Sequence, residues 1–219
     1  MPDISTINNV AVADISKFES ITFAHGQKVN NQDVSLVTDA HTLISTHTAD
    51  GSSIDINITS GIDSTYDVYE FHFINIHPSD SGSSGQFLFQ VSTGTGFDQL
   101  EITSTAVRAY QQEDDSGGSV DYRNTEDQAE TANYELIMEG IHNDDDTGGS
   151  GTLTLYAPSS TTYIKNFMSM ANTTLTAGTK QDFHSGYIDT TSAITQISFK
   201  MSSGTMDAGV IKMYGLAIS

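Results

Sequence analysis

Two alternating segments between residues 66 and 92 constrain the fold more than any other part of the chain. Successive side chains of a strand point to opposite faces, so apolar residues at every second position predict strands with one buried face. The positions predicted to face a core are Tyr69, Phe71 and Phe73 in the first segment and Phe87, Phe89 and Val91 in the second. Between them, Pro78 and the Ser- and Gly-rich residues 79–85 predict a loop. The sequence therefore predicts a hairpin with a long exposed loop.

Similar short strand patterns recur along the chain, with turn signals about every ten residues and no long helical pattern. The other predicted strands are 20–24, 33–38, 42–47, 53–59, 99–104, 106–111, 134–141, 152–157, 162–170, 183–188, 193–201 and 208–218. Many short strands separated by turns are typical of sandwiches and barrels. We expect an all-β protein, a jelly-roll-like antiparallel β-sandwich with an N-terminal arm. An up-and-down barrel is the alternative.

The chain has 219 residues, a length that one β-sandwich domain can fill. Residues 1–18 show weak periodicity and several Asn and Asp, so they predict an arm that is either frayed or held by a neighbouring subunit. Residues 19–219 are expected to form a single β-sandwich domain. The first ten residues have neither a basic nor an apolar region, so no secretory signal is expected.

The net charge of −20 is the strongest compositional feature, with 28 Asp and Glu against eight Lys and Arg. Binding to nucleic acid or to anionic membranes needs clustered basic residues, so neither partner is expected. The charge is consistent with solubility in a salty medium or with binding of divalent cations. The chain has no Cys, which excludes disulfides, thiolate metal sites and a Cys nucleophile.

Residues 113–133 are polar, acidic and almost without large aliphatic side chains. They predict an exposed excursion with one or two helical turns at 126–132, either functional or simply a mobile solvated loop. Acidic loops at 113–118 and 143–151 combine adjacent carboxylates with Gly pairs. Each is either a solvated turn or a calcium or magnesium site, although neither has the alternating spacing of an EF-hand.

Catalytic motifs give little support for an enzyme. Neither a G-x-S-x-G nor a phosphate-binding Gly-rich loop occurs. A polysaccharide-degrading enzyme needs a spaced carboxylate pair and commonly uses aromatic platforms, but the chain has no Trp. No catalytic, cofactor-binding or metal-ligating residue is therefore predicted, and no cofactor.

Histidines and tyrosines provide the remaining candidates for binding. The seven histidines, expected to be scattered or hydrogen-bonded rather than metal ligands, are His25, His41, His47, His72, His77, His142 and His184. Three tyrosines, Tyr110, Tyr122 and Tyr187, could stack on sugars if exposed, although Tyr in strands is more often half-buried packing.

Several segments resemble structural proteins of marine tailed phages, of the cyanophage and pelagiphage type. These segments are Asp67–Ser79 (DVYEFHFINIHPS), Phe89–Thr93 (FQVST), Ala157–Phe167 (APSSTTYIKNF) and Thr190–Leu216, and the similarity spans about residues 34 to 219. The motifs are packing and turn motifs, so they transfer no functional residue.

The resemblance implies a non-enzymatic virion surface protein, most simply a capsid decoration, knob or head-fibre subunit. An acidic protein is disfavoured next to packaged DNA, which agrees with a place on the virion surface. Virion proteins assemble by symmetry, so a homo-oligomer and contacts with other capsid or tail proteins are expected. The alternatives are a tail-fibre or receptor-binding subunit that recognises host glycans and, from another class, a polysaccharide-degrading enzyme.

Overall fold

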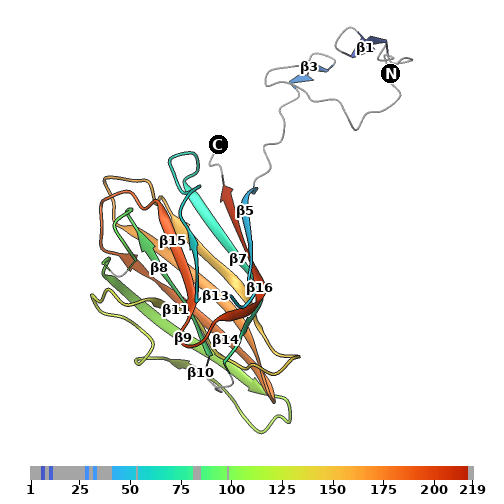
Figure 1. Ribbon diagram of the computed structural model, residues 1–219, viewed down its shortest axis with the longest axis vertical. Helices are drawn as coiled ribbons and strands as arrows, with labels where there is room; N and C mark the ends of the chain where they lie inside the picture. The colour runs from blue at the N-terminus through green and yellow to red at the C-terminus, as the bar shows by residue number, and fades with distance from the viewer. Residues whose placement is uncertain are drawn as a thin grey trace. The chain divides into compact units, whose positions relative to one another are not determined.

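A computed structural model describes residues 41–52, 54–80, 85–97 and 99–216, together with the backbone of four short strands before residue 41. The chain divides into two compact units, Met1–Ala40 and His41–Ser219 (Figure 1).

The first unit contains two pairs of short strands. They are β1 (Thr6–Ile7) with β2 (Val10–Ala11), and β3 (Lys28–Val29) with β4 (Gln32–Asp33), each pair antiparallel. The predicted boundary between residues 18 and 19, the predicted strand 20–24 and all of 33–38 after its first residue lie outside the described residues.

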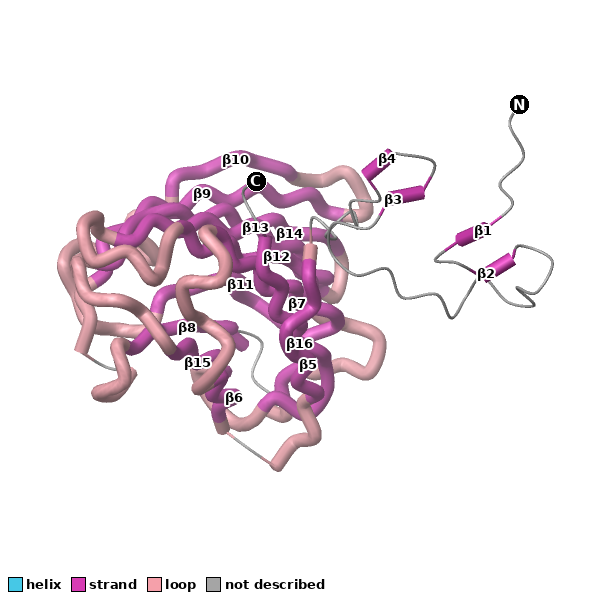
Figure 2. Tube along the Cα trace, turned by 90° about the horizontal axis from the view of Figure 1, so that it is seen from above, coloured by secondary structure: helices cyan, strands magenta, loops and turns pink. Residues whose placement is uncertain are grey.

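The second unit is a sandwich of two antiparallel sheets, and Figure 2 shows the two layers. The larger sheet has eight strands, in the order β10 (Gly118–Tyr122), β9 (Ile102–Gln112), β14 (Gly178–Ile188), β13 (Lys165–Leu175), β12 (Gly149–Tyr156), β7 (Val68–Pro78), β16 (Met206–Leu216) and β5 (Thr42–Thr48). The smaller sheet has four, in the order β11 (Glu135–Ile141), β8 (Gly85–Ser92), β15 (Gln196–Met201) and β6 (Asp55–Ile58). The all-β sandwich is confirmed, whereas the single sheet of an up-and-down barrel is not formed; the jelly-roll connectivity stays a prediction.

Aromatic side chains fill the space between the sheets. The predicted core positions on β7 and β8 are all buried, and so are Phe167 and Phe199. Phe73 of the larger sheet packs edge-on against Phe87 and Phe199 of the smaller sheet, with ring centroids 5.0 and 5.2 Å apart. Edge-to-face pairs of this kind add stability beyond the area they bury.

The predicted hairpin at 66–92 is wrong, although both of its strands and their buried faces are right. β7 pairs with β12 and β16, whereas β8 pairs with β11 and β15 in the other sheet. The two aromatic faces therefore meet across the core instead of lying side by side. Alternation identifies which face is buried, but it does not identify the partner strand.

Two further predictions are corrected. The predicted strands 99–104 and 106–111 are one continuous strand, β9, because Thr105 simply takes an outward position in the ladder. The expected helical turns at 126–132 are absent from the described structure, where Thr131 instead forms an isolated bridge with Ile102. No helix in the described parts of the chain is long and apolar enough to cross a membrane.

Candidate functional site

The eight-stranded sheet has an outer face, which we define as the side chains on its strands that point away from the core, and no part of the described sandwich covers it. β13 illustrates its origin, because its residues alternate between buried and exposed along the whole strand. Phe167 and Ala171 point into the core, whereas Met168 and Met170 point outward. The inward set satisfies the core, so the outward set is free for another role.

The outer face carries almost no charge. In the regularly paired parts of the described strands, its acidic and basic side chains are Glu70 and His72 on β7 and Lys212 on β16. Thr, Ser, Asn, Gln and apolar residues occupy the other outward positions. For a chain with 28 carboxylates and a net charge of −20, this distribution is highly uneven.

Apolar side chains run across this face as a continuous row. The strand registers place Tyr122, Val107, Phe183 and Met170 next to one another on β10, β9, β14 and β13. Met170 is 49% exposed, Phe183 is 39% exposed and the neighbouring Met168 is 56% exposed. Large apolar side chains with this exposure, grouped on one face, mark interaction surfaces more often than isolated ones do.

Two depressions lie on either side of this row. One, of about 570 Å³, is lined by Tyr110, Asn172 and Gln181 among other residues. The second, of about 440 Å³, is lined by Tyr156, Met168 and Tyr187 among others. The outer face therefore has both projecting side chains and hollows that could receive them.

In the regularly paired part of the outer face, the one carboxylate, Glu70, is held by two histidines. Glu70 Oε2 lies 3.0 Å from His41 Nε2 and 3.1 Å from His72 Nε2. Burial alone raises the pKa of Glu70, but its hydrogen bonds to His72 and His41 outweigh this effect, so the pKa is lowered. The ring of Tyr214 packs against both imidazoles, which keeps this group compact.

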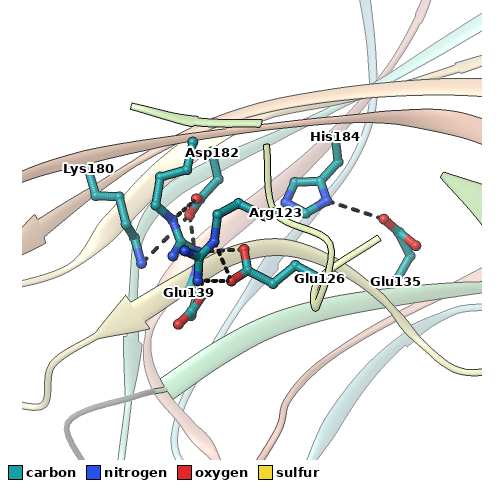
Figure 3. A network of polar contacts seen from close by, with 8 residues as sticks. Arg123, Glu126, Glu135, Glu139, Lys180, Asp182 and His184 are labelled. Atoms are coloured by element: carbon teal, nitrogen blue, oxygen red, sulfur yellow. Dashed lines mark hydrogen bonds and ion pairs between the residues drawn. The ribbon is translucent and has the colours of Figure 1, made fainter. Parts of the chain in front are cut away.

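A buried charge network lies on the opposite, inner side of the larger sheet (Figure 3). Arg108 of β9 donates from Nε to Asp182 of β14 over 2.8 Å and from Nη2 to Glu126 over 2.6 Å. Its Nη2 also contacts Glu139 of β11. Asp182 accepts the backbone N–H of Glu139 as well, at 3.2 Å. One guanidinium thus joins both sheets and the 123–133 segment.

The ionisation of this network follows from its burial. Burial alone lowers the pKa of Arg108, but the hydrogen bonds and charges of Asp182 and Glu139 outweigh it and raise the pKa. For Lys180, burial prevails and lowers the pKa, because its Nζ is 3.9 Å from Asp182, too far for a hydrogen bond. These groups pair mainly with one another inside the sandwich, which indicates a structural role.

A second buried pair joins Glu135 and His184, 3.3 Å apart (Figure 3). Ser169 lies opposite His184 in the β13–β14 register, but its buried hydroxyl forms no hydrogen bond. A serine nucleophile needs a hydrogen bond to its base and access for substrate. This serine has neither in the described structure, so the pair is better explained as part of the polar core.

The histidines considered as site residues are dispersed over the sandwich. The described ones, each with at least one hydrogen bond, are His41, His47, His72, His77, His142 and His184. His25 lies outside the described residues. Within the described part of the chain, no three His, Asp or Glu side chains are placed to hold a metal ion.

The two acidic loops form ordinary turns in the structure. In loop 113–118, Asp114 accepts the backbone N–H of Ser116 at 3.0 Å, and the side chain of Ser116 and then this backbone bond lower the pKa of Asp114. In loop 143–151, the carbonyl of Asp144 accepts the Thr147 hydroxyl at 2.9 Å. Turns stabilised in this way need no cation to close them.

The three tyrosines considered for sugar contacts lie on or near the outer face. Tyr110 and Tyr187 line its two depressions, one each. Tyr122 is 56% exposed and donates its hydroxyl to Asp127. The structure thus associates three separately considered residues with one surface, which sequence reasoning did not identify.

Comparisons of this chain with protein-family models, with curated proteins and with solved structures found no match.

Proposed function

We propose that this chain is a non-enzymatic structural subunit of a tailed-phage virion, placed on the particle surface as a capsid decoration, knob or head-fibre subunit. The observation that carries the proposal is the outer face: a broad, uncharged and partly apolar surface on an otherwise acidic protein. Interfaces are depleted of charged residues and enriched in Met and aromatic residues at their centres. Assembly with other proteins therefore explains this surface better than catalysis does.

The sequence resemblance supports the same function, and so do the acidic remaining surface and the two-unit organisation. Packaged DNA would repel a protein with a net charge of −20, which favours an outward position. The separate Met1–Ala40 unit could attach the sandwich to a neighbouring virion protein.

The copy number in particles tests this function. Quantitative mass spectrometry of purified virions should give on the order of a hundred or more copies per particle for a symmetric capsid decoration. A few to tens of copies would instead indicate a tail or vertex protein. Absence from the particle would contradict a virion role.

A receptor-binding subunit that recognises host glycans is the second candidate. The larger depression favours it, because Gln111, Asn172 and Gln181 point outward there and offer amide groups that suit a neutral sugar. Binding of the protein to intact host cells, and its loss in Gln181→Ala, would support this candidate. A polysaccharide-degrading enzyme receives no such support, since Glu126 is only 7% exposed where it pairs with Arg108.

A further inference from the structure

We infer that a second copy of this chain docks on the outer face, so that two eight-stranded sheets stack face to face. The inference rests on the proposed function in taking this face as the assembly surface, and it adds the identity of the partner.

Charge determines where two copies can meet. Each copy has a net charge of −20, so two copies repel each other across most of their surfaces. On the outer face, Glu70 and Lys212 cancel, and two histidines already bind Glu70. Contact through the regularly paired part of this face brings together only one carboxylate from each copy.

The area is sufficient for a stable dimer. Eight strands about 4.8 Å apart and about 30 Å long give a face of roughly 1,000 Å². A standard interface takes about 800 Å² from each partner. A pair of these faces can therefore form an interface of ordinary size.

The outer sides of the two sheets are covered by the chain's own loops to different extents. On the smaller sheet, Gln90 and Ser198 point away from the core, yet both are fully buried. Gln90 Nε2 donates to the carbonyls of Leu100, Ala132 and Asn133, so the chain's own loops cover that side. On the larger sheet, Met168, Met170 and Phe183 remain exposed among the described residues. A second molecule can supply the cover that the described residues do not.

The pattern of projecting side chains and hollows on this face suits a two-fold symmetric dimer. An isologous interface uses the same patch on both partners, so the patch must complement itself. The row containing Met170 and Phe183 lies between the depression at Asn172 and Gln181 and the depression at Tyr187. Rotation by 180° about an axis that lies in the plane between the two faces, parallel to this row, can place the projecting side chains of one copy over a hollow of the other.

The test is the oligomeric state of the full chain, measured by sedimentation equilibrium and light scattering. We expect a dimer whose dissociation constant decreases severalfold as the salt concentration rises, because salt screens the repulsion between two acidic copies. Met170→Glu and Phe183→Glu should each weaken dimerisation roughly 10- to 100-fold, the effect expected of a residue central to an interface. The matched control is Ile54→Glu, which puts the same charge on an apolar residue that is 66% exposed outside this face.

A second measurement is independent of these variants. Mild peroxide oxidation of the unmodified protein should modify Met168 and Met170 more slowly at concentrations where the dimer prevails than at high dilution. A monomer at all concentrations, or a dimer that Met170→Glu and Ile54→Glu weaken equally, would overturn the inference. Since both measurements are made in solution, they can fail while the copy number in virions still supports the proposed function, and the reverse also holds.

Discussion

Arg108 joins carboxylates from three segments that are distant in the sequence, on β11, β14 and the loop before β11. Its side chain is 10% exposed, and its partners Asp182 and Glu126 are 1% and 7% exposed. Removing one partner from a buried ionic group leaves uncompensated charge, which costs more than the paired group contributes. The network therefore specifies how these segments pack.

Replacement of Arg108 tests this role. We expect Arg108→Met to lower the free energy of unfolding by about 3–5 kcal/mol, because three carboxylates lose their common partner. Arg123→Met is the matched control: Arg123 also pairs with Glu126, but its side chain is 34% exposed, so the loss should stay below about 1 kcal/mol. Urea unfolding followed by circular dichroism measures both. Equal losses for the two variants would contradict a special role of Arg108.

His77 should make stability depend on pH. Its Nδ1 lies 2.7 Å from Asp207 and its Nε2 lies 3.2 Å from the carbonyl of Asp144, so only the imidazolium can donate to both acceptors. Burial alone lowers the pKa of His77, but these hydrogen bonds and the charges of Asp207 and Asp145 outweigh it and raise the pKa. A raised pKa in the folded state means that protonation stabilises the fold.

The sign of the effect follows from this shift. The contribution of His77 is complete below its unfolded pKa, about 6.5, and is lost as the pH rises through the higher folded pKa. The difference in unfolding free energy between the unmodified protein and His77→Gln should therefore shrink as the pH is raised from 6 to 8. Asp207→Asn should remove most of the same pH dependence. If the unfolding free energies of the unmodified protein and of His77→Gln changed in parallel with pH, His77 would not be the source of the pH dependence.

At the residue scale, the sequence predicts buried positions better than polar partners. The alternation of Phe71 and Phe73 with His72 depends only on neighbouring residues, and it correctly marks the core side. The bonds of Arg108 depend on the registers of β9, β11 and β14, which no local pattern contains. Its carboxylate partners could not be separated from the many exposed acidic residues for this reason.

The segment 113–133 forms more regular structure than its polar composition predicts. Its polar, acidic residues predict an exposed excursion, and its side chains are indeed exposed or half-buried, but the segment also forms β10 and then returns to the sheet. Gln128 donates its backbone N–H to the hydroxyl of the buried Ser104 and accepts the backbone N–H of Ser104, each at 3.0 Å, and Glu126 pairs with Arg108. Polar contacts, rather than apolar burial, hold this segment.

Proteolysis tests how firmly the segment is held. Glu126→Gln should speed trypsin cleavage after Arg123, because it weakens the bonds from Arg123 and Arg108 that hold this turn. Glu113→Gln, the same change at an exposed position of the same segment, should leave the cleavage rate close to that of the unmodified protein. Mass spectrometry of the early fragments gives both rates. Cleavage equally fast in both variants would show that the ion pairs do not hold the segment.

Strand partners are the part of the fold that sequence reasoning misses at the element scale. The strands on either side of residues 79–85 are adjacent in the sequence, and adjacent strands often pair, so a hairpin is the natural expectation. Instead, their two strongly aromatic faces pack against each other across the core. Placing β7 and β8 in opposite sheets buries both faces in one core, which a flat hairpin cannot do.

At the scale of the whole molecule, the described core lies entirely within the second unit. Its buried cluster runs from Ile58 to Met213. A variant that begins at His41 should therefore keep the β-sheet circular dichroism spectrum of the full chain. Its melting temperature should change by no more than about 4 °C, the shift that roughly 1 kcal/mol produces in a domain of this size. Loss of cooperative melting would show that residues 1–40 are part of the folding unit.

The outer face could have been noticed in the sequence, although it was not. The outward positions of residues 103–109, 150–156, 166–174 and 179–187 contain no Asp, Glu, Lys or Arg. In an acidic chain, this is a usable signal. The uncharged face becomes evident only when the order of strands in the sheet places these segments side by side. That order depends on pairing between strands that are far apart in the sequence.

β16 occupies a position in the larger sheet that affects how the protein is made. It lies between β7 and β5, and it pairs Val210 with Thr48, 162 residues earlier. During synthesis, β5 leaves the ribosome long before the strand that joins it to the sheet. Until then, its backbone donors and acceptors have no native partner, and non-local pairing of this kind slows folding. The nascent chain thus has an open strand that other copies or chaperones can reach, and expression at low temperature or with a chaperone should raise the yield of folded protein.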